Sequence, residues 1–274
     1  RGAAPPRWNT SQGLGAWYRA RVQRSANSRL EGGWLDMAGA VFFRIRSFAP
    51  LPVIFVVVWQ SWRAHVHPGP GGADVDRVLN FVGLGLCFAG AFIRFATVGF
   101  IPEGTSSTSR HLQSHALNTG GPYAVVRHPL YLGNLFITVG LLCIAHDPWA
   151  WTLGFGYFLL SHLLIIRAEE ALLRRTFAAQ YDEWAARVPG WLPRLSGLKA
   201  LTGPFGWKRA IQREVNPFVG WGMGATVLVM WEDFARTQLT PALARRGLLA
   251  LGLFLLLLMV NKVWKKWSRA HEPK

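Results

Sequence analysis

The feature that most constrains this chain is a series of six apolar runs, each bounded by charged, aromatic or Pro-containing segments. They cover residues 48–62, 79–100, 130–145, 149–166, 217–231 and 247–263. A helix needs about 20 apolar residues to cross a bilayer, with a lower limit near 17. The first and fifth runs are short, so flanking residues would have to extend them. We predict an all-α, polytopic membrane helix bundle of about six transmembrane helices with cytoplasmic interfacial helices. For the first run, a re-entrant or interfacial helix is the alternative.

Composition agrees with a membrane protein. Charged residues make up 16% of the chain and hydrophobic residues 51%, whereas an average soluble domain is about 25% charged. This excludes a disordered chain and disfavours an ordinary soluble enzyme. The two cysteines, Cys87 and Cys143, both lie in apolar runs. Two are too few for a disulfide framework, and a thiolate metal site is disfavoured, so no bound metal is expected.

The distribution of Lys and Arg predicts the orientation. With the N-terminus inside, the inner segments carry 23 Lys and Arg and the outer loops carry 5. This bias predicts a multi-pass protein of an inner or plasma membrane with both termini cytoplasmic. It also places segments 101–128 and 169–216 on the same side of the membrane.

The chain divides into three predicted parts. Residues 1–47 form an Arg-rich interfacial arm that leads into the first span, residues 48–195 form the transmembrane core, and residues 196–274 form a basic cytoplasmic loop followed by two transmembrane helices. The net charge of +16 is compatible with nucleic acid, but beside six apolar runs an anionic membrane surface is the better partner. We therefore expect a membrane partner and no nucleic acid.

Residues 115–133 carry the densest set of chemical groups. A Gly- and Pro-containing loop leads into a span at Pro129, and proline at a first helical position costs no hydrogen bond. The helix start offers free N–H groups and partial positive charge. Titratable groups at the end of a membrane span cost free energy, so their presence indicates a function. Taken singly, Arg127 and His128 could simply reach toward lipid phosphates.

Two motifs give the combination its specificity. The first is Gly121-Pro122-Tyr123 followed by Arg127-His128-Pro129-Leu130-Tyr131-Leu132-Gly133, with His115, Leu117 and Thr119 upstream. The second follows the next span and comprises Glu169-Glu170, Phe177, Tyr181, Trp184, Val188-Pro189 and Pro193. Over about residues 79–195, the chain resembles the isoprenylcysteine carboxyl methyltransferase family and the related phospholipid N-methyltransferases.

The resemblance implies a membrane-embedded transferase that uses S-adenosylmethionine in a cytoplasmic pocket formed by the two motifs, with a tunnel for lateral entry of a lipid. The implied cofactor-binding residues are His115, Leu117, Asn118, Tyr123, His128, Pro129, Tyr131, Leu132, Glu169 and Glu170. We predict Arg127, His128, Arg167 and Glu170 as catalytic residues, and Arg94 and Arg167 as substrate-binding residues. The chain departs from the family pattern at Ile165, where members often carry an arginine.

The chemistry of these side chains fits such a cofactor. A tyrosine face attracts a sulfonium by about 0.5–2 kcal/mol, and Glu169 or Glu170 can accept from an amino group or ribose hydroxyls. The helix start after Pro129, or Arg127, can bind a carboxylate. Methyl transfer needs alignment rather than a metal. Glu170 could instead pair with Arg174 at i,i+4, and the helical offset between the two glutamates predicts different roles for them.

The chemical class of the methyl acceptor is limited by what its nucleophilic atom needs from the protein. An anionic oxygen needs only cationic positioning, whereas an amine needs a base. Arg94, Arg127 and Arg167 favour an anionic lipid headgroup or a prenylated peptide carboxylate, while an amine or a lipid phosphate stays open. The alternatives from other classes are an NADPH-dependent membrane reductase, similar to sterol reductases, and a non-catalytic lipid-binding protein. Of the remaining histidines, we expect His146 to be solvated and His162 to be packed and hydrogen-bonded.

Overall fold

The computed structural model describes residues 38–39, 41–42, 52, 55, 72–101, 117–194, 197, 199, 201, 203–237 and 240–271. Throughout these ranges the regular secondary structure is helical. The long helices are α4 (Gly72–Phe100), α5 (Pro129–Ala145), α6 (Gly156–Phe177), α8 (Trp207–Thr237) and α9 (Pro241–Ala270). The shorter elements are η3 (Gly121–Ala124), η4 (Ala150–Phe155) and α7 (Ala179–Arg187).

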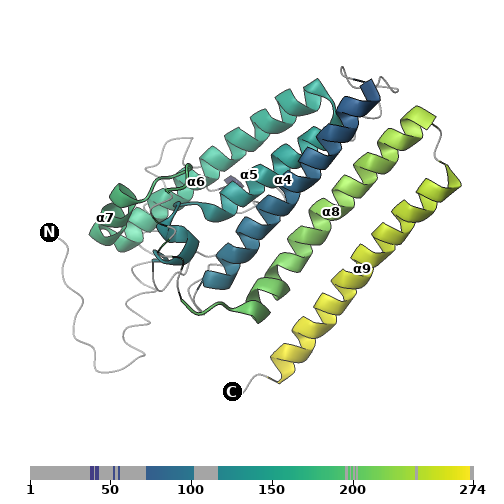
Figure 1. The fold of residues 1–274 in the computed structure, drawn as a ribbon. Coiled ribbons are helices and arrows are strands. Elements are labelled where there is room, and N and C mark those ends of the chain that lie inside the picture. The colour runs from purple at the N-terminus through teal and green to yellow at the C-terminus, as the bar shows by residue number, and fades with distance from the viewer. Residues whose placement is uncertain are drawn as a thin grey trace.

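The long helices lie side by side in the order α6, α5, α4, α8, α9, with α7 at one end (Figure 1). Among the residues that the structure describes, three stretches are long and apolar enough to cross a membrane: Asp74–Phe100, Ala150–Phe177 and Pro241–Ala270. Helix α5 is apolar but shorter, at 17 residues. These helices make the chain an integral membrane protein.

Five of the six predicted spans fall within helices of the structure. Runs 79–100 and 130–145 lie in α4 and α5, run 149–166 lies mainly in η4 and α6, and runs 217–231 and 247–263 lie inside α8 and α9. Helix α8 begins at Trp207, ten residues before the predicted span, and continues through Pro217. The run 48–62 and the arm 1–47 lie almost wholly outside the described residues, so the count of six spans and the interfacial arm stay predictions.

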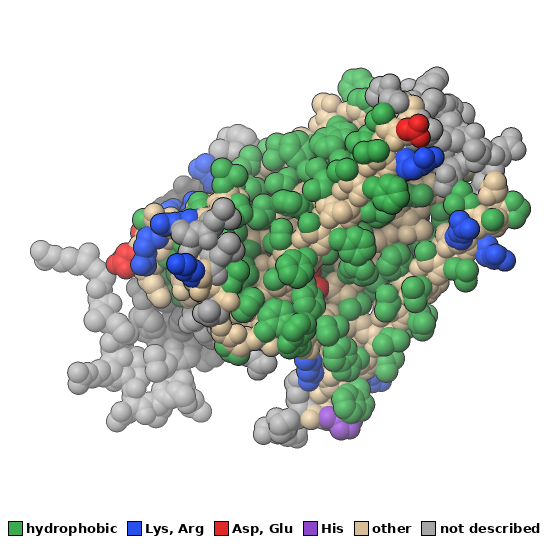
Figure 2. Space-filling view, in the orientation of Figure 1, with side chains coloured by type: hydrophobic (Ala, Val, Ile, Leu, Met, Phe, Trp, Pro, Cys, Tyr) green, Lys and Arg blue, Asp and Glu red, His purple; other side chains and the backbone are tan. Residues whose placement is uncertain are grey.

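The outer surface of the bundle is apolar. Figure 2 shows hydrophobic side chains covering the middle of one face, with Lys and Arg toward its ends. Phe81 and Phe92 of α4 are 70% and 71% exposed, and Leu248, Leu253 and Met259 of α9 are also exposed. Apolar patches of this extent are rare on soluble monomers. This surface fits lipid tails, because helices satisfy their backbone hydrogen bonds internally.

Helices α4 and α5 approach closely through two glycine pairs. A Cβ at Gly83 would lie 2.5 Å from the carbonyl oxygen of Gly140, and a Cβ at Gly90 would lie 2.5 Å from that of Gly133. Both pairs are buried at this contact. Small residues at such spacing let membrane helices pack backbone to backbone. The contact fixes the start of α5, which carries the first motif, against the end of α4.

Helices α8 and α9 form an antiparallel hairpin with a polar seam. Asn261 is buried and donates to the Asn216 side chain (3.0 Å) and to the Gln212 carbonyl (3.3 Å). Gln212 in turn donates to the Ser268 hydroxyl at 3.1 Å. Polar side chains that bond across helices stabilise association in a bilayer by about 0.6 kcal/mol each on average. The hairpin then packs on α4 through α8.

The glycine contact predicts a stability difference between two alanine variants of α4. Gly90→Ala should lower the free energy of unfolding by about 1–3 kcal/mol, because its Cβ meets backbone atoms that move only with the helix. Gly85→Ala is the matched control, since nothing lies within 4 Å of a Cβ there. Alanine should be neutral or stabilising by up to about 1 kcal/mol at that site. Thermal unfolding of both variants in detergent micelles tests this, and equal midpoints would contradict the close approach.

Candidate active site

The first motif folds as a short helical turn followed by the start of α5. Gly121 has a φ of +56°, and a Cβ there would lie 2.7 Å from Cβ of Phe100, so the turn favours glycine for both conformation and space. His128 is the N-cap residue of α5 and Pro129 is its first residue. The backbone N–H groups of Tyr131 and Leu132 donate to the carbonyl of His128. The local sequence therefore places His128 and Tyr131 on the first turn of a membrane helix.

Glu170 of α6 joins the cationic groups of the first motif. Its Oε1 accepts from Nη1 of Arg127 at 2.8 Å and lies 2.9 Å from Nε2 of His128. A carboxylate only accepts, so Nε2 of His128 carries a proton in this contact. The alternative pairing of Glu170 with Arg174 is not the arrangement found, because Arg174 pairs with Asp182 at 2.7 Å. Arg127 and His128 are therefore held by protein.

Glu169 contacts a different residue. Its Oε2 accepts from the hydroxyl of Tyr131 at 2.8 Å. The ring of Tyr131 stacks on His128, with centroids 5.8 Å apart, and meets the ring of His162 edge to face at 5.5 Å. The two neighbouring carboxylates thus hold two different parts of the first motif, and Tyr131 lies between two imidazoles.

The rest of the second motif packs under the first. Tyr181, Trp184 and Val188 form a buried cluster against Tyr123 and Leu117. The indole N–H of Trp184 donates to the carbonyl of Tyr123 at 3.2 Å. Partial burial, together with the Glu169 carboxylate, raises the pKa of the Tyr123 hydroxyl, so this hydroxyl stays protonated at neutral pH.

Backbone hydrogen bonds also tie the two motifs together. The N–H of Arg127 donates to the carbonyl of Pro189 at 2.8 Å, and the N–H of Arg194 donates to the carbonyl of Val125 at 2.9 Å. One buried polar atom of this region, Nε of Arg127, has no hydrogen-bond partner among the residues that the structure describes. Buried polar groups are normally satisfied, so the site has capacity for a polar ligand or water.

The structure brings some of the predicted site residues together and does not bring others together. It brings together Leu117, Tyr123, Arg127, His128, Pro129, Tyr131, Glu169 and Glu170. Asn118 and Leu132 are half-buried nearby in sequence, and the Arg167 side chain is exposed. His115 lies outside the described residues. The roles predicted for all these residues stay predictions.

Arg94 has partners that the sequence did not indicate. It donates to both carboxylate oxygens of Glu214, at 2.8 and 3.0 Å, and to Oδ1 of Asn134 at 2.6 Å. The sequence does mark both partners by position. Glu214 is a single acidic residue in a basic stretch, and Asn134 is a polar residue one helical turn after Tyr131. The substrate-binding role of Arg94 stays a prediction beside this network. His162 is packed and hydrogen-bonded as predicted: it is buried, and its Nδ1 lies 3.0 Å from the carbonyl of Phe158.

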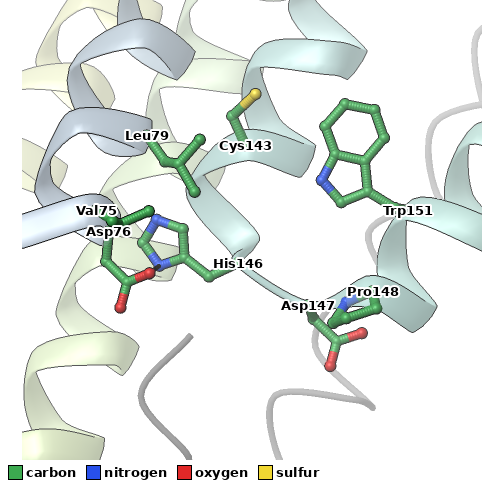
Figure 3. A pocket seen from close by; sticks show the side chains of 8 residues that line it. All are labelled: Val75, Asp76, Leu79, Cys143, His146, Asp147, Pro148 and Trp151. Carbon is green, nitrogen blue, oxygen red and sulfur yellow. Dashed lines mark ion pairs between the residues drawn. The ribbon is translucent and has the colours of Figure 1, made fainter. Parts of the chain in front are cut away.

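A separate cavity of about 350 Å³ lies where α4 begins and α5 ends. Figure 3 shows His146 facing Asp76 in it, with their side chains 3.9 Å apart, while Asp147 points away. Asp147 accepts from the backbone N–H of Ala150 at 2.6 Å. The expectation that His146 is solvated is wrong, because its side chain is only 7% exposed. Its left-handed backbone (φ 52°) ends α5 at this pair, far along the bundle from both motifs.

Among the described residues, no three His, Cys, Asp or Glu side chains come together as a metal site. The expectation of no bound metal stays a prediction.

Comparison with known proteins finds that part of this chain matches a known family. Residues 78–180, which contain the first motif and the start of the second, match the family described as phospholipid methyltransferase. This match confirms the resemblance that the motifs predict. No solved structure matches the chain.

Curated relatives are of two kinds. The nickel-cobalt-cadmium resistance protein NccN of Alcaligenes xylosoxydans xylosoxydans is 33% identical over 124 residues, which are 45% of this chain and 57% of NccN. The protein-S-isoprenylcysteine O-methyltransferase of Tribolium castaneum is 28% identical over 150 residues, covering 52% of this chain and 50% of the relative. Protein-S-isoprenylcysteine O-methyltransferase B of Arabidopsis thaliana is 33% identical over 131 residues, covering 45% and 64%. The chain thus spans about half to two thirds of the length of these relatives.

The Glu170 contacts predict a loss of stability on truncation. Glu170→Ala should lower the free energy of unfolding by about 1–3 kcal/mol, because Arg127 and His128 lose a charged partner in a mostly buried setting. Glu183→Ala, at an exposed position of α7, is the matched control and should change stability by less than about 0.5 kcal/mol. Thermal unfolding in detergent measures both. A Glu170→Ala midpoint equal to that of the control would show that these contacts do not hold the motifs together.

Proposed function

We propose that this chain is an integral membrane methyltransferase that uses S-adenosylmethionine and methylates the headgroup of a lipid or prenylated substrate. The acceptor would be a carboxylate, phosphate or amine at the cytoplasmic leaflet. The observation that carries the proposal is the joining of two motifs, some 40 residues apart in sequence, by hydrogen bonds of 2.8–2.9 Å at the start of α5. The family match and the names of the methyltransferase relatives support it.

The residues present fit the proposed cofactor. Its sulfonium supplies a methyl group on a leaving group that needs no further activation. The ring of Tyr131 offers an aromatic face of the kind that attracts a cation. Glu169 and Glu170 bind the first motif through one oxygen each, and a carboxylate has about four acceptor positions, so both retain capacity for amino or hydroxyl donors. Nε of Arg127 is buried and has no partner among the described residues, and it is a donor suited to a carboxylate.

In this proposal the protein contributes alignment rather than acid–base chemistry. His128 and Tyr131 are fixed by Glu170 and Glu169, so the aromatic and imidazole groups keep one arrangement at the membrane surface. A methyl transfer between fixed partners gains most from such positioning. The excess of Lys and Arg in the predicted inner segments supports a cytoplasmic site. The packing of Tyr181 and Trp184 of α7 against Tyr123 of the first motif supports a site that is covered on this side.

Ligand binding tests the proposal directly. S-adenosylmethionine should raise the melting temperature of the purified protein, because a ligand that binds only the folded state stabilises it, while NADPH should leave it unchanged. The substitutions His128→Ala, Tyr131→Ala and Glu169→Ala should each reduce cofactor binding by ten-fold or more while the protein stays folded. Glu183→Ala serves as the control. Stabilisation by NADPH alone would favour the reductase alternative.

The acceptor is found by incubating the protein with methyl-labelled S-adenosylmethionine and a total membrane lipid extract, followed by mass analysis of labelled products. If the three variants bind the cofactor as tightly as the parent, the assigned site is wrong.

A further inference from the structure

A chain of polar side chains crosses the bundle beneath the candidate site and links it to the C-terminal hairpin. It starts at Glu214 of α8, passes through Arg94 of α4 and Asn134 of α5, and ends at His162 of α6. The contacts are 2.8 and 3.0 Å from Glu214 to Arg94, 2.6 Å from Arg94 to Asn134, and 3.5 Å from Asn134 to His162. His162 then meets the ring of Tyr131.

These residues lie inside the helices of the bundle rather than at the helix ends. Arg94 lies six residues before the end of α4, Asn134 five residues after the start of α5, and Glu214 seven residues after the start of α8. At 1.5 Å per residue this is roughly 8–11 Å from each helix end. The side chains of Arg94 and Glu214 are only 16% and 10% exposed. Removing one partner of an ion pair as buried as this one leaves an uncompensated charge and is costly.

The hydrogen bonds along the chain have a single consistent direction. A carbonyl only accepts, so Nδ1 of His162 donates to Phe158, and Nε2 is left as the acceptor of a neutral ring. Arg94 only donates, so Asn134 must turn its oxygen toward Arg94 and its amide nitrogen toward Nε2 of His162. Arg94 thereby sets the orientation of the Asn134 amide, which offers an N–H to the imidazole that touches Tyr131.

We propose that Glu214 and Arg94 are positioning residues for methyl transfer, which act through Asn134 and His162 on the ring of Tyr131. This inference rests on the proposed function. Glu214 lies outside the residues that match the family, 78–180, so the hairpin α8–α9 supplies a part of the site that the matched core lacks. The chain reaches Tyr131 at its ring, whereas Glu169 binds its hydroxyl.

In this geometry, the residues that align Tyr131 differ from those proposed to set the affinity for the cofactor. The carboxylates of Glu169 and Glu170 lie at the second motif, away from the Glu214 end of the chain. Loss of Glu214 should therefore leave cofactor affinity nearly unchanged while it lets Tyr131 shift. A misplacement of about 1 Å can cost about 100-fold in rate.

The experiment compares Glu214→Gln, Arg94→Met and the double variant with the parent. Glutamine keeps the size of Glu214 but replaces one acceptor oxygen by an amide that faces an arginine donor. We expect methyl transfer from labelled S-adenosylmethionine to a membrane lipid extract to fall about ten-fold or more in each single variant, with a cofactor Kd within about three-fold of the parent. The double variant should be no slower than the slower single one, because both break one chain.

Two further readouts separate positioning from simple loss of stability. The nitrogen-15 signal of the His162 ring should shift in both single variants. Asn261→Ala is the matched control: it weakens the same hairpin but leaves Arg94 in place, so it should lower the melting temperature without changing the rate per folded molecule or the His162 signal. If Glu214→Gln does not fold, Asn134→Ala replaces it, with the same expected rate and affinity.

Parental rate and an unchanged His162 signal in Glu214→Gln would overturn the inference while leaving the proposed function standing. A loss of cofactor affinity equal to the loss of rate would also overturn it. Failure of the parent itself to bind S-adenosylmethionine is a different result and would overturn the proposed function.

Discussion

The arrangement of the candidate site depends on two adjacent carboxylates in the C-terminal half of α6 that reach the first turn of α5. A bilayer offers no water to buried polar groups, so the cations and phenols at the mouth of a membrane helix need protein partners. Glu170 supplies one for Arg127 and His128, and Glu169 supplies one for Tyr131. Because consecutive helical residues point in different directions, the pair can hold two sides of the motif at once.

The backbone contact between α4 and α5 makes room for the deeper polar chain. A Cβ at Gly133 would lie 2.5 Å from Cγ of Arg94, so glycine there both admits the neighbouring helix and leaves the path of the arginine open. That path ends at Asn134, the next residue, and at Glu214. One glycine of the first motif therefore serves the packing of the bundle and the electrostatics beneath the site together.

The long helices and the two motifs could be predicted from the sequence because both follow from local sequence patterns. Apolar runs located α4, α5, α6, α8 and α9, and the order of two motifs located both halves of the site. The partners of Arg94 could not be predicted, since Glu214 lies 120 residues away and its pairing depends on which helices are neighbours and at what depth. The same limit applies to His146, whose burial against Asp76 follows from how α5 ends rather than from its own loop. Where α8 begins was also hidden, because Pro217 resembles a helix start while the helix in fact continues through it.

The structure also changes the inference, drawn from the basic residues, about the charge of the methyl acceptor. From sequence, Arg94, Arg127 and Arg167 together favour an anionic headgroup. Glu214 offsets the charge of Arg94 and Glu170 offsets that of Arg127, and of the three only Arg167 has an exposed side chain. An arginine already bonded to a carboxylate attracts a second anion less, because the pair is close to neutral. The basic composition of the mouth therefore fits attraction to an anionic membrane surface better than recognition of an anionic acceptor.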